Sequence, residues 1–203
     1  MGQVKFVNPD IESSYREPKI GEILFNAVIE SRPKVIVDFG LLYGYSTVCL
    51  GMAAKHVGAM VYSYDIFEDY PYNKSDMSVI LSNVERYNLQ DCVRVEKKNF
   101  FEWIKDPEHF DMLHVDISNT GETVEIIYNN LRDKNMTNGR VFFEGGSKDR
   151  DLMDWMVRYN KKTFSSIASK VKYTVLREQS YVGADNRIIS PSISEILFAG
   201  GDR

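Results

Sequence analysis

Four acidic residues stand at or just after the ends of short apolar runs, where a carboxylate could take part in chemistry. They are Asp38, Asp65, Asp116 and Glu144. At the carboxyl edge of a parallel sheet, such acids can orient a cationic group, accept hydrogen bonds from a sugar or take a proton from a nucleophile. The simpler alternatives are that Asp65 is a solvated carboxylate and that Glu144 only flanks a helix.

A glycine-bearing segment follows the first of these runs. Gly40 and Gly44 would let the backbone pass close to a ligand. Tyr45 and Ser46 would open the next helix with free amide groups. A helix-start turn that merely needs glycine would have the same sequence. Asp65, which ends the next apolar run, is placed to accept hydrogen bonds from ribose hydroxyls, so the order of these features favours a nucleoside-type cofactor.

The glycine spacing distinguishes between cofactors. Dinucleotide-binding turns read G-x-G-x-x-G, whereas this turn reads G-x-x-x-G, and the chain has no G-x-x-x-x-G-K-[ST] phosphate loop. A buried acid at Asp38, beside the turn, suits a cationic amino group better than a pyrophosphate. The pattern therefore points to S-adenosylmethionine, whose methionyl end carries an amine and a carboxylate.

The segment VDFGLLYGYST, residues 37–47, resembles motif I of the class I S-adenosylmethionine-dependent methyltransferases, especially the small-molecule O-methyltransferases. The resemblance extends from about Pro33 to Gly146. It implies that the methionyl part of the cofactor is bound by Asp38, Gly40, Gly44, Tyr45 and Ser46. It further implies that Asp65 binds the ribose, that Ile66, Asn99 and Phe100 contact the adenine, and that Asp116 faces the reactive sulfonium.

Asp116 and Glu144 are the two carboxylates that could accept a proton from a hydroxyl acceptor. In the metal-dependent O-methyltransferases that the chain resembles, these positions supply Mg²⁺ ligands. Those enzymes typically show Asp-Asn where this chain has Glu144-Gly145, and often Lys or His where it has Ile117-Ser118-Asn119. Two carboxylates could still hold Mg²⁺, but we do not favour a metal-dependent reaction and assign no residue as a metal ligand.

Short apolar runs bounded by turn residues predict the strands that position these side chains. The predicted strands cover residues 34–40, 59–67, 110–117, 140–144, 171–178 and 193–199. Residues 93–99 alternate between apolar and polar side chains and predict a further strand near a sheet edge. Helical spacing predicts helices over 19–31, 77–84, 124–131 and 152–159, with Asn119 as the N-cap of the third. We therefore expect an α/β fold with a Rossmann-like, doubly wound, mostly parallel seven-stranded sheet and an antiparallel C-terminal strand pair.

Length and charge restrict the class of protein. The chain has 203 residues, a formal net charge of −4 and two cysteines. We expect a single methyltransferase domain over residues 32–203, preceded by an N-terminal arm and helix over 1–31. The acidity disfavours nucleic acid and anionic membranes as partners, and no segment has the apolar length of a signal peptide or membrane span. A cytoplasmic protein is expected, and a homodimer would be compatible with the sequence.

The leading hypothesis is an S-adenosylmethionine-dependent methyltransferase that moves a methyl group to a small-molecule acceptor, at a hydroxyl oxygen. One alternative is a non-catalytic module that binds the cofactor in the same fold. A second is a nicotinamide-dependent dehydrogenase, which the missing third glycine disfavours. The tyrosine-rich loop over residues 70–74 and the segment 144–151 are the candidate acceptor contacts.

Overall fold

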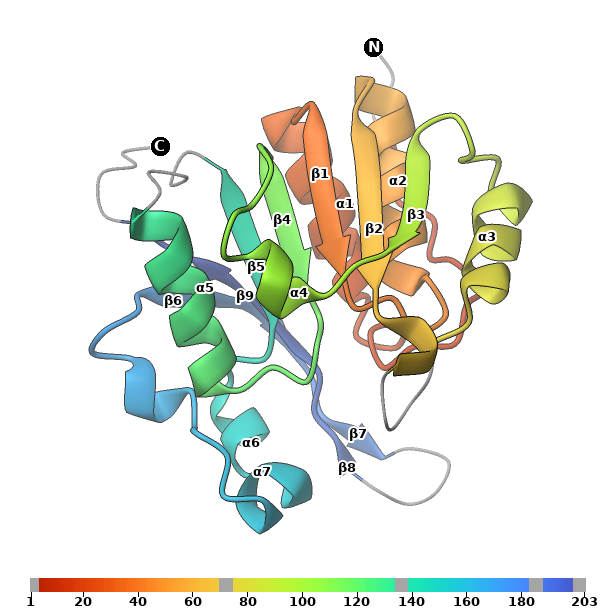
Figure 1. Ribbon diagram of the computed structural model, residues 1–203. Helices are drawn as coiled ribbons and strands as arrows, with labels where there is room; N and C mark the ends of the chain where they lie inside the picture. The colour runs from red at the N-terminus through yellow and green to blue at the C-terminus, as the bar shows by residue number, and fades with distance from the viewer. Residues whose placement is uncertain (1–3, 70–74, 134–138, 183–187, 199–203) are drawn as a thin grey trace. The chain divides into compact units, whose positions relative to one another are not determined.

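The computed structural model describes residues 4–69, 75–133, 139–182 and 188–198 (Figure 1). The chain divides into two compact units, residues 1–99 and 100–203. The loop over residues 70–74, a predicted acceptor contact, lies outside the described residues.

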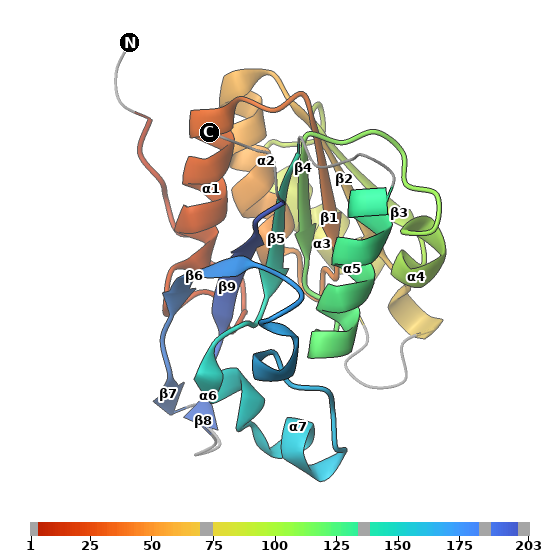
Figure 2. The same cartoon turned by 90° about the vertical axis from the view of Figure 1, so that its left-hand side faces the viewer.

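The first unit is built around parallel strands. In the order β3-β2-β1, these are β1 (Val35–Phe39), β2 (Met60–Asp65) and β3 (Val93–Lys97). β1 is buried along almost its whole length, as its continuous apolar run predicts. The helices are α1 (Ile20–Ser31), α2 (Tyr45–Val57) and α3 (Met77–Arg86). Figures 1 and 2 show α1 and α2 packed side by side on one face of β1 and β2.

The second unit holds the remaining strands of the sheet. They are β4 (Met112–Val115), β5 (Arg140–Glu144), β6 (Tyr173–Glu178) and β9 (Ser192–Ile196). β4 and β5 are parallel, and β9 runs antiparallel to both β5 and β6. The helices are α4 (Phe100–Trp103), α5 (Gly121–Asp133), α6 (Lys148–Asp151) and α7 (Asp154–Arg158), with a 3-10 turn over Ser165–Ile167. In Figure 2, α6 lies beside a small hairpin formed by β7 (Tyr181–Val182) and β8 (Ile188–Ile189).

The predicted fold class is confirmed. The strands form a seven-stranded, mostly parallel sheet that closes with the antiparallel pair β6 and β9, and β3 stands at one edge. Each segment predicted as a strand overlaps an observed strand. The segments of β1, β4 and β5 are buried inside the sheet, as their apolar runs predict.

Two local predictions differ from the structure, and one small element was not predicted. The N-cap of α5 is Thr120, whose Oγ1 accepts a hydrogen bond from the Thr123 amide at 3.3 Å, whereas Asn119 donates back to the Val115 carbonyl at 2.8 Å. The helix expected over 152–159 is replaced by α6 and α7, because Met153 between them is extended. Leu152 is 74% exposed, so the apolar spacing there does not reflect burial. The β7–β8 hairpin was not predicted, since its strands are too short to show a period.

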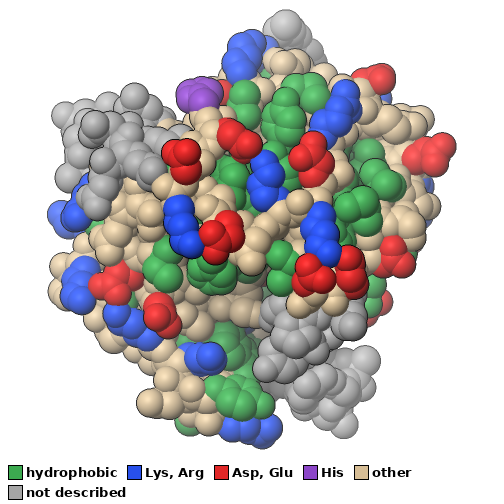
Figure 3. All heavy atoms as spheres, viewed as in Figure 1, with side chains coloured by type: hydrophobic (Ala, Val, Ile, Leu, Met, Phe, Trp, Pro, Cys, Tyr) green, Lys and Arg blue, Asp and Glu red, His purple; other side chains and the backbone are tan. Residues whose placement is uncertain are grey.

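Charges of both signs are mixed on the described surface. Figure 3 shows acidic and basic side chains interspersed on the face in view. Lys97 pairs with Glu68, and both Lys162 and Lys170 pair with Glu125, so these lysines do not form an uncompensated basic patch. Among the described residues, every helix is too short or too polar to cross a bilayer.

Candidate functional site

The turn between β1 and α2 needs glycine at two positions. Gly40 and Gly44 have φ angles of 86° and 85°, in the region that residues with a side chain rarely adopt. A Cβ at Gly44 would also lie 3.1 Å from Cγ2 of Ile80. The Gly40 amide donates to the carbonyl of Tyr64 at 3.1 Å, and the Gly44 amide donates to that of Leu41 at 2.6 Å. The predicted ligand-binding turn is therefore a fixed structure at the end of β1.

α2 starts directly above a buried acid. The helix begins at Tyr45 and has no side-chain cap, so the amide groups of its first turn, which have no acceptor within the helix, can bind a carboxylate. Asp38 is fully buried and its Oδ2 accepts hydrogen bonds from Ser46 Oγ at 3.1 Å and Thr47 Oγ1 at 2.8 Å. Because the Ser46 hydroxyl is directed at Asp38, the backbone amide is the group of Ser46 that suits a ligand carboxylate.

The Tyr45 side chain contacts the N-terminal arm. Its hydroxyl donates to Asn8 Oδ1 at 2.7 Å, and its ring meets that of Tyr15 edge-on at 6.5 Å between centroids. Burial raises the pKa of the Tyr45 phenol well above its usual value, with a further contribution from Cys49. Tyr45 therefore joins the arm to α2 through its side chain, and only its amide suits the cofactor. The arm residue Asn8 was not predicted, and nothing in its sequence context indicates this contact.

Asp65 connects the turns that follow β1 and β2. Its Oδ2 accepts a hydrogen bond from the Leu41 amide at 2.7 Å, and its Oδ1 accepts one from the Phe67 amide at 2.9 Å. Phe67 begins the short 3-10 helix η1 (Phe67–Asp69) with a positive φ of 50°. A carboxylate oxygen can accept two hydrogen bonds, so ribose hydroxyls could share these oxygens with the backbone. Asp65 thus stabilises the two turns through these backbone hydrogen bonds and is also a candidate ribose ligand.

The remaining predicted adenine contacts fall on both sides of the unit boundary. In the first unit, Ile66 is half-buried after β2, and Asn99 is exposed after β3. The carboxyl ends of the parallel strands therefore bring Ile66 and Asn99 to the same edge as Asp38 and Asp65. Phe100 belongs to the second unit, where it is 3% exposed and packs in an aromatic cluster with Phe101 and Trp103.

In the second unit, Asp116 and Glu144 are brought together as predicted. β4 and β5 are parallel and Val115 pairs with Phe143, so the two acids follow in adjacent positions. Glu144 is only 5% exposed. Burial raises the pKa of Glu144 to about 8, and the charge of Asp116 adds to the rise while Arg150 opposes it.

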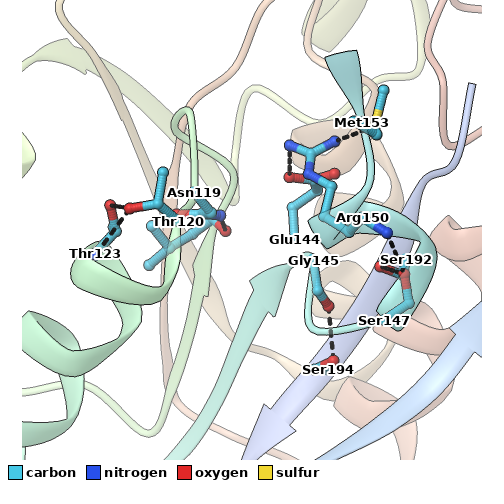
Figure 4. A network of polar contacts seen from close by, with 11 residues as sticks. Asn119, Thr120, Thr123, Glu144, Gly145, Ser147, Arg150, Met153, Ser192 and Ser194 are labelled. Carbon is cyan, nitrogen blue, oxygen red and sulfur yellow. Dashed lines mark hydrogen bonds and ion pairs between the residues drawn. The ribbon is translucent and has the colours of Figure 1, made fainter. Parts of the chain in front are cut away.

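Glu144 has a partner that was not predicted. Arg150 Nη2 donates to Glu144 Oε2 at 2.6 Å, as Figure 4 shows. The guanidinium also lies 3.5 Å from Met153 Sδ through Nη1 and 5.1 Å from the ring centre of Trp155. In the polar run EGGSKDRD, the sequence suggests that Arg150 is a solvated residue. Only the structure shows that it donates a hydrogen bond to Glu144 at the end of β5.

The turn between β5 and α6 holds Arg150 in this place. Gly145 and Gly146 have φ angles of 110° and 96°, and a Cβ at Gly146 would collide with the Ser194 hydroxyl. That hydroxyl donates to the Gly145 carbonyl at 2.7 Å, and Ser192 Oγ donates to Ser147 Oγ at 3.1 Å (Figure 4). Two buried serines of β9 therefore anchor the turn between β5 and α6.

The residues at the ends of β4 and β5 do not fit a divalent metal. A group of three or more His, Cys, Asp and Glu side chains that could hold one is absent from the described residues. The acid at Glu144, which such a metal would need, already accepts from the guanidinium of Arg150. We therefore assign no step to a metal.

Comparison with known proteins identifies the family. A family model described as a methyltransferase domain matches residues 37–144, which is more than half of the chain and includes the glycine turn, Asp65, Asp116 and Glu144. The chain belongs to this methyltransferase family. Membership confirms the resemblance that the motif after β1 indicated, and it removes the dehydrogenase alternative. No curated protein matches the chain.

Solved structures share the fold of this methyltransferase at low sequence identity. An O-methyltransferase from Bacillus cereus in complex with S-adenosylhomocysteine is 20% identical, with a TM-score of 0.59 over 94% of this chain and 84% of that chain. The O-methyltransferase TomG from Streptomyces achromogenes, in complex with S-adenosylmethionine, is 14% identical, with a TM-score of 0.57 over 91% and 86%. The S-adenosylhomocysteine-bound methyltransferase PaMTH1 from Podospora anserina is also 14% identical, with a TM-score of 0.59 over 88% and 77%. At these identities the likeness shows the fold alone.

Proposed function

We propose that this methyltransferase binds S-adenosylmethionine in its first unit and transfers the methyl group to a hydroxyl oxygen of a small molecule. The observation that carries the proposal is the buried Asp38 beneath the uncapped start of α2, with Asp65 at the end of the neighbouring strand. This arrangement offers an anion for the methionyl amine, amides for its carboxylate and acceptors for the ribose. The complexes of similar structures with S-adenosylmethionine or S-adenosylhomocysteine support the choice of cofactor.

Different residues of the first unit would bind different parts of the cofactor. The negative charge of Asp38 orients the methionyl amine, and the amides of Tyr45 and Ser46 bind its carboxylate. Gly40 and Gly44 let the backbone lie against the methionyl tail. The adenosine would contact Asp65 through its ribose, and Ile66 and Asn99 through its base.

The reaction needs one proton acceptor beside the acceptor hydroxyl. The acceptor oxygen attacks the methyl carbon, the carbon–sulfur bond breaks, and its electron pair returns to sulfur to give S-adenosylhomocysteine. The hydroxyl proton passes to a carboxylate, and this role suits Asp116, which follows β4 and is only half-buried. Glu144 accepts from Arg150 and would act as a positioning residue for that guanidinium. The similar structures named as O-methyltransferases support oxygen as the acceptor atom.

Isothermal titration calorimetry tests the cofactor directly. The purified chain should bind both S-adenosylmethionine and S-adenosylhomocysteine with one site each, and it should not bind NAD, because the turn lacks the third glycine of a dinucleotide site. A folded protein that binds neither sulfur-containing ligand would overturn the proposed function.

A further inference from the structure

Resting on the proposed function, we infer that the guanidinium of Arg150 is the resident cation of the acceptor site in the second unit. The guanidinium donates to Glu144, the acid that a divalent metal would need as a ligand. Its remaining N–H groups stabilise the acceptor oxygen as the hydroxyl loses its proton. Arg150 thereby supplies the positive charge that metal-dependent O-methyltransferases obtain from Mg²⁺.

The ion pair is buried and short. Arg150 Nη2 and Glu144 Oε2 are 2.6 Å apart, and the two side chains are 13% and 6% exposed. A buried carboxylate that loses its cationic partner is strongly destabilised, so the guanidinium is not readily exchanged for a hydrated metal ion. Arginine also stays charged at every pH at which the protein is folded, which makes it a permanent cation.

The guanidinium has hydrogen-bonding capacity that its neighbours do not use. It carries five N–H donors, and the acceptors near it are Glu144 Oε2 and the weak sulfur of Met153. Its Nε is buried and has no acceptor among the described residues. Trp155 lies against the guanidinium, 5.1 Å from ring centre to Cζ, and fixes its plane. A charged donor group with unused N–H bonds, held beside an acid, is suited to an oxygen that develops negative charge.

The segment that carries Arg150 is anchored on both sides. Ser147 caps α6 by accepting from the Arg150 amide at 3.2 Å, and Ser192 in turn donates to Ser147. On the other side, Asp151 is 9% exposed and accepts from the Phe164 amide at 2.6 Å and the Ser165 amide at 3.0 Å. The guanidinium is thus preorganised before a substrate arrives, which is what electrostatic stabilisation of a transition state requires.

Two side chains of the second unit, Asp116 and Arg150, then take part in the reaction at the acceptor oxygen. The O–H bond breaks and its proton goes to the Asp116 carboxylate, while the new O–CH₃ bond forms and sulfur takes the electron pair of the broken carbon–sulfur bond. The N–H groups of Arg150 stabilise the partial negative charge on the acceptor oxygen. Asp116 follows Val115, which pairs with Phe143 just before Glu144, so the proton acceptor and the ion pair lie at adjacent strand ends.

Binding of Mn²⁺, measured by electron paramagnetic resonance, tests whether Arg150 stands in the place of a metal. The proteins are the wild type, Glu144→Gln, Arg150→Ala, Arg150→Gln and the double variant Arg150→Ala with Glu144→Gln, all titrated at about pH 8, where protons compete less for the carboxylates than at neutral pH. The wild type should show no stoichiometric site. Removal of the guanidinium should tighten Mn²⁺ binding by about ten-fold or more, and the double variant should lose that gain. Arg150→Gln keeps the test available if Arg150→Ala does not fold.

Two results would overturn the inference. One is a stoichiometric Mn²⁺ site in the wild type that Glu144→Gln abolishes. The other is the same absence of binding in the wild type and in both Arg150 variants, because the guanidinium would then not be what excludes the metal. Calorimetry with S-adenosylhomocysteine on the same proteins separates this inference from the proposed function. All variants should bind that ligand as the wild type does, and loss of binding in the wild type would count against the cofactor and not against Arg150.

Discussion

The turn after β1 and the turn after β5 both hold a carboxylate away from water, but they balance its charge differently. Asp38 accepts hydrogen bonds from two neutral hydroxyls, those of Ser46 and Thr47. Glu144 accepts from the guanidinium of Arg150. The hydroxyl donors bring no charge to Asp38, whereas Arg150 brings a positive charge to Glu144 and carries N–H donors that Glu144 does not use. The first turn therefore suits a cation and the second suits a developing anion.

The largest effect should follow from breaking the ion pair of the second unit. Above about pH 8, where Glu144 is ionised, Arg150→Ala leaves its carboxylate buried without the guanidinium, and removing one partner of a buried pair costs about 3 kcal/mol of unfolding free energy. Urea unfolding followed by circular dichroism measures the loss. Lys148→Ala, at an exposed position of the same helix, should change the stability by less than about 0.5 kcal/mol. Equal losses in the two variants would contradict the difference between the turns.

Asp65→Ala should have the next largest effect, on ligand binding in the first unit. Two ribose hydroxyls lose a charged acceptor, and we expect the affinity for S-adenosylhomocysteine to fall by about 2 kcal/mol, or roughly 30-fold. Asp69→Ala, which changes an exposed acid of η1, is the matched control and should leave the affinity unchanged. Calorimetry gives both values, and thermal denaturation shows whether the loss of the Leu41 and Phe67 contacts unfolds the turn. A folded Asp65→Ala protein with normal affinity would reject the ribose assignment.

The pH dependence of stability should come mainly from the second unit. Burial raises the pKa of Glu144 from 4.5 to about 8, so its contribution to stability is fully present below 4.5 and is lost as the pH rises through 8. Over that window the free energy of unfolding falls by at most about 1.4 kcal/mol per pH unit as the pH rises, because the folded state holds a proton that the unfolded state releases. Urea unfolding at several pH values should show this slope in the wild type. Glu144→Gln should remove most of it, and Asp149→Asn, at an exposed site in α6, should not. An unchanged slope in Glu144→Gln would place the titration elsewhere.

The smallest effects concern single hydroxyl groups. Ser46→Ala removes a hydroxyl hydrogen bond to the Asp38 carboxylate and should cost about 1.5 kcal/mol of unfolding free energy. Ser192→Ala removes a bond between two neutral hydroxyls in the other turn and should cost about 0.5 kcal/mol. Urea unfolding compares the two. The opposite ranking would mean that the charge on Asp38 is not what the hydroxyls of α2 stabilise.

The same contrast explains how much the sequence predicts. The fold class, the strands and the glycine turn follow from local patterns, because Asp38, Gly40, Gly44 and Ser46 lie within one strand–turn–helix segment. The turn after β5 depends on contacts between distant residues. Arg150 reaches Glu144 only because two glycines adopt positive φ, and the anchoring serines come from β9, far along the chain. Such contacts leave no periodicity in the sequence.

Two smaller failures have the same cause. The amphipathic spacing over 152–159 predicted one helix, yet Leu152 and Tyr159 are exposed and only the shorter α7 forms within that range. The hydroxyl of Tyr45 is bound by Asn8, a residue of the N-terminal arm that no motif identifies. In both places tertiary contacts, and not local preference, decide the structure.

A titration of S-adenosylhomocysteine into the wild type, Asp38→Asn and Arg150→Gln tests the central claim most directly, because it assigns the cofactor to one of the two turns. Asp38→Asn keeps the shape of the side chain but removes the charge that orients the methionyl amine, so its affinity should fall by about ten-fold, whereas Arg150→Gln should bind as the wild type does. The account would be contradicted if the folded wild type did not bind the ligand, or if Arg150→Gln lost affinity and Asp38→Asn kept it.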